Sequence, residues 1–386
     1  MSAAAAAAAS SPFPLTPAAQ RGPLDLVVAA GGDVAYPDNW IDQDFAQAGS
    51  RLFSSVAPYV READLAFVNL ESPLTRAPIS LKKTYPIRTS PERLEWLLGG
   101  GFNLFSLANN HIYDSGRRGL LDTLDLLESS SRAGQAFWWA GAARKQDEAW
   151  RPLVFRPPGK DLKVAFLAFG SAGTPLVPSP HGPRAMQAVR EASEQADLVI
   201  VSAHTGREYQ HVPSQRKADL FRSFVEAGAD VVLGHHPHVI QGVESYQGGI
   251  IFHSLGNFSF ASKTVRHHKT GAKLYGMLPL IEVRGGQVQR AAIIPLYVNN
   301  AERWRLGKKV VEPRPCVPQV VEGAFAQEIL QSLQKWTHAL PGVSPQARRS
   351  FQVRRGHAMV RVGQKEAGGR NQEEGSAERA PKETGN

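Results

Sequence analysis

The chain has 386 residues, 42% of them hydrophobic, which is enough for one large folded domain or two smaller ones. The single cysteine, Cys316, excludes a scaffold held together by intrachain disulfides. The net charge of +9 favours anionic partners such as phosphate esters or acidic polymers, although a solvated basic surface explains the charge equally well. The sequence has no zinc-finger spacing and no aromatic RNA-reading motif, so no nucleic-acid partner is expected.

The chain begins with a segment of low complexity. Residues 1–22 are poly-Ala followed by Ser and Pro, and we expect them to form a disordered leader. They have no basic start and no Leu-rich core, so a signal or transit peptide is the less favoured interpretation. No run of apolar residues is long enough to predict a transmembrane segment. A cytoplasmic or peripherally membrane-associated protein is therefore expected.

The middle of the chain, residues 23–362, alternates strand-like and helix-like patterns and is predicted to fold as one unit. Near-continuous apolar runs predict buried strands at 24–30, 64–68, 102–107, 164–169, 197–202, 230–233 and 249–253. Amphipathic patterns predict helices at 90–98, 116–129 and 214–228, and an antiparallel strand pair is predicted at 280–283 and 288–294. This order predicts an α/β or α+β layered sandwich. Residues 363–386 are mostly polar and charged, and a disordered tail is expected there.

Polar side chains follow most of the predicted strands. In chain order these segments are Gly31-Gly32-Asp33, Asn69-Leu70-Glu71, Asn109-Asn110-His111, His204, Gly234-His235-His236-Pro237-His238 and Ser254-Leu255-Gly256-Asn257. Ligands of open α/β sheets bind beyond the carboxyl ends of the strands, so we expect these residues to meet in one site. Each segment alone is also explained as a turn or a helix cap, and the prediction rests on the whole set.

The residue types in this set fit two divalent metal ions. The predicted ligands are the carboxylates of Asp33 and Glu71, the amide of Asn110, and the imidazoles of His204, His236 and His238. Mixed nitrogen and oxygen ligands suit Mn, Fe or Zn. A pair of ions about 3.5–4 Å apart activates water and stabilises an in-line displacement.

Other residues near the predicted ligands are assigned to catalysis or to substrate binding. His111 would protonate a leaving oxygen as general acid, and Asp33 is counted with it as catalytic. Arg207, Asn257 and Asn69 are predicted to contact an anionic substrate, and Arg207 is favoured because its planar fork pairs with carboxylate or phosphate. Asp114 is expected to shape the loop after His111, and His211 and His253 to lie at the pocket wall. The basic residues of 263–269 are predicted to form an anion-receiving rim, with a plain solvated loop as the alternative.

The order of these motifs resembles the capsule-synthesis family CapA, which is linked to poly-γ-glutamate. The segments that carry the resemblance include Asn69-Leu70-Glu71-Ser72-Pro73-Leu74, Ala108-Asn109-Asn110-His111-Ile112-Tyr113-Asp114-Ser115-Gly116, Ala203-His204-Thr205-Gly206-Arg207-Glu208-Tyr209 and Ser254-Leu255-Gly256-Asn257-Phe258. The whole resemblance covers residues from about 24 to 300. The family is similar to the calcineurin-like metallophosphoesterases, which implies a four-layer αββα sandwich with a dinuclear metal site.

The resemblance also implies roles for single residues. Asp33 matches the first aspartate of the superfamily, Glu71 stands at the position of the bridging aspartate, and Asn110 and His111 match a ligand and the general acid. His204, His236 and His238 match the remaining histidine ligands, with an alternative register through His235. Ala35 stands where the first motif has a ligand histidine, and this departure leaves open whether one or two metal ions bind.

Two functions are compatible with the sequence. The first is a metal-dependent, phosphoesterase-like hydrolase linked to the synthesis or export of an anionic capsule polymer such as poly-γ-glutamate. The second is a non-catalytic scaffold that keeps one metal ion and holds the acidic polymer for a capsule synthase or exporter. The missing histidine at Ala35 and the basic charge balance favour the scaffold, and the set of strand-end ligands favours the enzyme.

Overall fold

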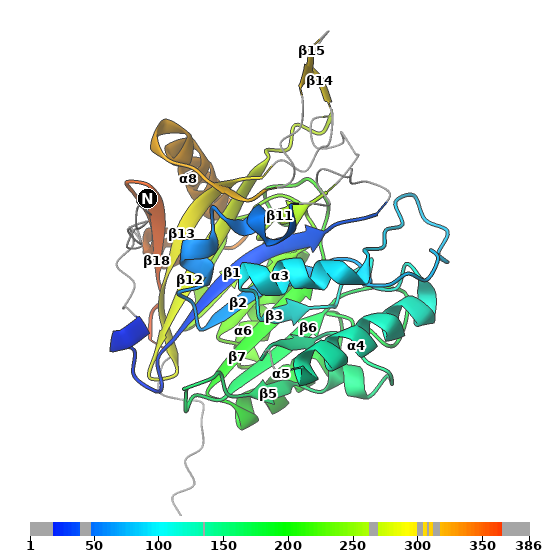
Figure 1. Ribbon diagram of the computed structural model, residues 1–386. Helices are drawn as coiled ribbons and strands as arrows, with labels where there is room; N and C mark the ends of the chain where they lie inside the picture. Colours follow the sequence, from blue (N-terminus) through cyan, green and yellow to red (C-terminus); the bar gives the residue numbers. More distant parts are fainter. Residues whose placement is uncertain are drawn as a thin grey trace, which may run out of the picture.

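The computed structural model describes residues 18–38, 48–133, 136–261, 269–298, 304–306, 309–311 and 317–364, and its fold is a mixed α/β architecture with two principal sheets (Figure 1). The larger sheet has the strand order β17-β18-β13-β12-β1-β2-β3-β4, with β11 beside β1 and β16 beside β13. Its strands are β1 (Leu26–Ala35), β2 (Leu65–Leu70), β3 (Leu104–Ser106), β4 (Trp138–Ala140), β11 (Asn257–Phe260), β12 (Tyr275–Arg284), β13 (Gln287–Tyr297), β16 (Gln319–Val320), β17 (Phe351–Arg354) and β18 (His357–Arg361).

The smaller sheet has the order β5-β6-β7-β8-β10-β9. Its strands are β5 (Leu153–Phe155), β6 (Val164–Phe169), β7 (Leu198–His204), β8 (Val231–His235), β9 (Val243–Tyr246) and β10 (Gly249–Phe252), and a separate pair is formed by β14 (Trp304–Leu306) and β15 (Lys309–Val311). The helices are α2 (Ala57–Val60), α3 (Leu94–Gly100), α4 (Gly116–Arg132), α5 (Pro183–Gln195), α6 (Gln215–Glu226), α8 (Gly323–His338) and α9 (Pro345–Ser350), with short 3₁₀ turns η1 (Ala18–Gln20), η2 (Gly49–Phe53), η3 (Pro91–Arg93) and η4 (Glu148–Trp150).

The two principal sheets share one apolar core. Phe67 of β2 packs edge-on against Phe166 of β6, with ring centroids 5.9 Å apart, and leucines of α3 and α4 belong to the same buried cluster. A second cluster lies between the smaller sheet and the helices α5 and α6, where Val189 and Phe224 pack with Val201. The predicted α/β class is confirmed in this coarser form, while the four-layer sandwich remains a prediction.

Several predicted elements are present but longer than expected. The first strand continues to Ala35, so Gly31, Gly32 and Asp33 lie inside β1 and not beyond its end. The histidines His204 and His235 are likewise the last residues of β7 and β8. A further correction concerns the helix predicted at 90–98, because it begins with the turn η3 and continues as α3 to Gly100.

The ends of the described region bear on the predicted domain boundaries. Arg21 was assigned to the leader, yet its guanidinium donates to Asp64 at 2.9 Å and its side chain is almost fully buried. The folded part therefore includes residues before 23. At the other end, the backbone amide of Val362 donates a hydrogen bond to the backbone carbonyl of Gln289, so residue 362 is still attached to the larger sheet. Among the described helices, none is both long and apolar enough to span a membrane.

Candidate functional site

The strand order of the two sheets brings the polar strand ends to one place. In the larger sheet β1, β2 and β3 run parallel, and Asp33 is in register with Asn69. In the smaller sheet β7 and β8 run parallel, and His204 is in register with His235. The carboxyl ends of both sets of strands therefore meet, and a hydrogen bond between His235 and Asp33 joins the two sheets.

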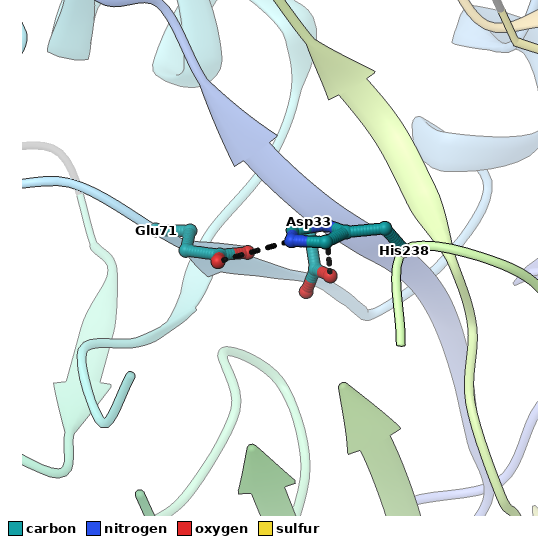
Figure 2. Close-up of side chains that lie close together, drawn as sticks. All are labelled: Asp33, Glu71 and His238. Atoms are coloured by element: carbon teal, nitrogen blue, oxygen red, sulfur yellow. Dashed lines mark ion pairs between the residues drawn. The ribbon is translucent and has the colours of Figure 1, made fainter. Parts of the chain in front are cut away.

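At the centre lie Asp33, Glu71 and His238, whose ligand atoms are all within 4.8 Å of one another. Figure 2 shows the His238 ring between the two carboxylates, with Nδ1 3.6 Å from Asp33 Oδ2 and Nε2 3.9 Å from Glu71 Oε1. Both carboxylates are fully buried. Asp33 Oδ2 and both carboxylate oxygens of Glu71 have no hydrogen-bond partner among the described residues. Buried, unpartnered carboxylate oxygens beside an imidazole form a donor set that fits a divalent cation.

The electrostatics of the two carboxylates agree with this fit. Burial, reinforced by the neighbouring charge of Asp33, raises the pKa of Glu71 well above its usual value. Burial also pushes the pKa of Asp33 upward, but the hydrogen bond from His235 and the nearby histidines outweigh it, so its pKa is lowered. A cation between the two groups would favour the ionised form of both.

A second group of donors adjoins the first. His204 Nε2 lies 2.8 Å from Asn110 Oδ1, 3.2 Å from His236 Nδ1 and 3.5 Å from Glu71 Oε1. Burial lowers the pKa of His204 well below its usual value and that of His236 to about 3, so both rings are neutral, as metal ligands must be. His236 and His238 adopt positive φ angles of 91° and 57°, which are uncommon for non-glycine residues and are found at functional sites as well as in turns.

Three residues orient these donors. Asn69 donates to Asp33 Oδ1 at 2.8 Å, and His235 Nδ1 lies 3.0 Å from the same oxygen. Asn257 Oδ1 lies 2.9 Å from His238 Nδ1, so that nitrogen donates and Nε2 keeps its lone pair on the side of Glu71. Asn69 was predicted to bind substrate, but its side chain is fully buried and occupied by protein partners. His235 contributes a ring whose Nε2 is buried without a hydrogen-bond partner in the described part of the chain.

One ring nitrogen of His111 faces Glu71, and the other contacts Asp114. Its Nε2 lies 3.9 Å from Glu71 Oε1, and its Nδ1 lies 2.8 Å from Asp114 Oδ2. Burial lowers the pKa of His111, and the hydrogen bond to Asp114 opposes that change. Sequence reasoning gave Asp114 only a loop-shaping role, whereas the structure adds a pairing with His111. The signal that could have revealed this pairing was the spacing of three residues between His111 and Asp114 inside one turn.

Some predicted residues lie outside this arrangement. Arg207 is exposed, and no contact joins it to the cluster in the described residues. Ala35 packs with Ile87 and Phe260, so an apolar contact fills the position of the histidine that the resemblance implies. Among the predicted rim residues, 263–268 lie outside the described part of the chain, and Lys269 is exposed.

The two predicted wall histidines have protein partners. His211 lies 3.0 Å from the carbonyl of Ile240 and stacks on Trp336 with ring centroids 3.7 Å apart. His253 Nε2 lies 3.3 Å from Glu244 Oε2 and its side chain is fully buried. Both histidines therefore serve packing in the structure.

Comparison with known proteins gives the family. The chain is 32% identical over 220 residues to the "PGA biosynthesis protein CapA" of Bacillus subtilis (strain 168), covering 54% of this chain and 56% of that protein. It is 31% identical over 229 residues to the "Capsule biosynthesis protein CapA" of Bacillus anthracis, covering 54% and 53%. A "Probable polyglutamine synthesis accessory protein" of Mycobacterium tuberculosis (strain CDC 1551 / Oshkosh) is 26% identical over 213 residues, covering 50% and 55%.

These alignments span about half the length of the relatives. Residues 27–262 match the family described as bacterial capsule synthesis protein PGA_cap. That range contains Asp33, Glu71, His111, His204 and the three histidines of 235–238. The chain therefore belongs to the bacterial capsule synthesis protein family PGA_cap.

Proposed function

We propose that this protein is a metal-dependent hydrolase of the phosphoesterase type that acts in the synthesis or export of an anionic capsule polymer such as poly-γ-glutamate. The observation that carries the proposal is the buried trio Asp33, Glu71 and His238, whose ligand atoms lie within 4.8 Å of one another. Three of its carboxylate oxygens lack hydrogen-bond partners among the described residues. Burying such groups without a partner costs several kcal/mol, and a divalent cation bound between them would offset that cost. The names of the relatives support the link to a capsule polymer.

In this proposal the strand-end residues divide into ligands and a proton donor. Asp33, Glu71, Asn110, His204, His236 and His238 hold one or two ions of Mn, Fe or Zn, and the fold is the four-layer αββα sandwich. The bound metal would lower the pKa of water and stabilise charge on the reacting group. His111, oriented by Asp114, donates a proton to the leaving oxygen. Asn69 and Asn257 keep Asp33 and His238 aligned.

Metal content tests the proposal directly. Elemental analysis after purification without chelators should find about one or more equivalents of transition metal per chain, and Asp33→Asn should lower this at least tenfold. Asp125→Asn is the matched control, because Asp125 is exposed on α4 and pairs with Arg144. Less than about half an equivalent in the wild-type protein would contradict the proposal.

The scaffold is the second candidate, and the apolar packing of Ala35 favours it because one expected ligand is absent. Turnover of phosphomonoesters and phosphodiesters with added Mn separates the two. The enzyme predicts measurable turnover and a loss on the order of 10²-fold or more in His111→Ala, while exposed His338→Ala retains activity. The scaffold predicts no turnover by either protein, together with salt-sensitive binding of polyglutamate.

A further inference from the structure

Lys83 lies beside the candidate site although no motif singles it out. It belongs to the loop 76–89, between β2 and η3. Its ammonium lies 2.5 Å from Asp114 Oδ1 and donates to the carbonyl of Asn110 at 2.9 Å. The side chain is 28% exposed, so a ligand can reach it from solvent. Lys83 thus contacts both a predicted metal ligand and the partner of the predicted general acid.

The loop that carries Lys83 is fixed to the turn after His111. The backbone amides of Ser80 and Leu81 donate to the carbonyl of Asp114 at 2.9 and 3.1 Å. On the other side of Lys83, the amide of Ile87 donates to Asp114 Oδ2 at 2.8 Å. These hydrogen bonds on both sides of Lys83 keep its ammonium near the site. Less conformational entropy of the loop is therefore lost when the ammonium binds a ligand.

The ammonium retains capacity for one more acceptor. A lysine has three N–H donors, and the hydrogen bond to the carbonyl of Asn110 together with the ion pair to Asp114 engages at most two of them. Arg76 and Arg88, the arginines of the same loop, are engaged by Glu92 and by backbone carbonyls.

We propose that Lys83 is a specificity-determining residue that binds one anionic oxygen of the substrate, contributed by a phosphate group or by a carboxylate of an acidic polymer. The inference rests on the proposed function and assigns to Lys83 the role that the sequence gave to Arg207. The protein contacts of Lys83 are fixed, and its ammonium still has an N–H group to donate. We infer that the acceptor for this group belongs to the ligand.

The test is calorimetric binding of inorganic phosphate and of a short glutamate oligomer, with and without Mn. Lys83→Met should weaken the binding of at least one of these probes by about tenfold or more, because it removes a charge-assisted hydrogen bond. Lys83→Arg keeps the charge and should recover most of the affinity. Lys82→Met is the matched control, because Lys82 is exposed on the same loop, and it should change affinity less than about threefold.

The outcomes separate this inference from the proposed function. Loss for phosphate alone identifies a phosphoryl ligand, and loss for glutamate alone identifies the polymer. Affinity within about threefold of wild type for both probes, or equal losses in Lys82→Met and Lys83→Met, overturns the role of Lys83. So does loss of metal in Lys83→Met, which would indicate a structural role. If Lys83→Met does not fold, Lys83→Gln is measured under the same criteria. Metal content and ester turnover of the wild type test the proposed function separately.

Discussion

Lys217 shows how a single residue couples the site to the stability of the fold. Its side chain is nearly inaccessible, donates to Gln241 Oε1 at 3.1 Å and lies over the ring of Phe221. Burial lowers its pKa from 10.5 to about 7, and the charge of Asp33 opposes the change. In the unfolded chain the lysine keeps its ordinary pKa. Between these two values the unfolded state binds more protons, so the free energy of unfolding rises with pH.

Lys217→Met should remove this pH dependence. Relative to wild type, the variant should be more stable at about pH 7, by up to a few kcal/mol, and lose the advantage towards about pH 10. Urea denaturation of both proteins across this range measures the difference. Lys335→Met, at an exposed position of α8, should follow the wild-type curve. A pH-independent difference between wild type and Lys217→Met would show that the lysine is not buried as the structure has it.

At the residue scale, the sequence predicted which side chains meet at the candidate site, but it did not predict the hydrogen bonds and ion pairs that position them. Asp33, Glu71, His204 and His238 could be found because each follows an apolar run of the sequence that predicts a buried strand. Asp114 and Lys83 could not be paired in advance, because η3, α3 and β3 lie between them in the chain and only tertiary packing brings the two side chains together. The substrate role of Arg207 stays a prediction, since its position in a motif carries no information about where its side chain points.

Among the elements, β1 departs most from its prediction because of two glycines. Gly31 and Gly32 read as a turn, yet they lie inside the strand. A Cβ on Gly32 would stand 1.9 Å from the carbonyl oxygen of Gly256, and that same oxygen accepts from the amide of Asp33 at 2.9 Å. The glycine therefore permits the close backbone approach that positions Asp33.

Gly32→Ala should consequently destabilise the protein by about 3 kcal/mol, because the clash is with backbone that cannot move aside. Gly99→Ala is the control, since Gly99 is an exposed helical position where alanine is favoured. It should change the free energy of unfolding by no more than about 1 kcal/mol. Chemical denaturation measures both, and equal stabilities would contradict the close approach of β1 to the loop before β11.

At the scale of the whole molecule, the folded unit extends beyond the residues that match the family. The match ends at residue 262, but β12 pairs antiparallel with β1, from Leu26 opposite Val283 to Ala29 opposite Leu280. The hairpin of β12 and β13 could be predicted from its sequence, because Gly285 and Gly286 both supply the positive φ of a tight turn. The position of this hairpin beside β1 could not be predicted, because strands that pair across more than 250 residues of sequence leave no local signal.

This arrangement predicts that residues 18–268 do not fold without the segment that follows them. Leu278, Leu280 and Ile281 of β12 are fully buried, and burying each such side chain contributes about 1.5–3 kcal/mol. Removing these three side chains and exposing the edge of β1 would therefore cost an energy close to the whole free energy of unfolding of a typical domain, about 5–15 kcal/mol. We expect residues 18–364 to melt cooperatively and 18–268 to aggregate or melt without cooperativity, as measured by calorimetry. Cooperative melting of the shorter form within a few degrees of the longer one would show that the family region folds independently of β12.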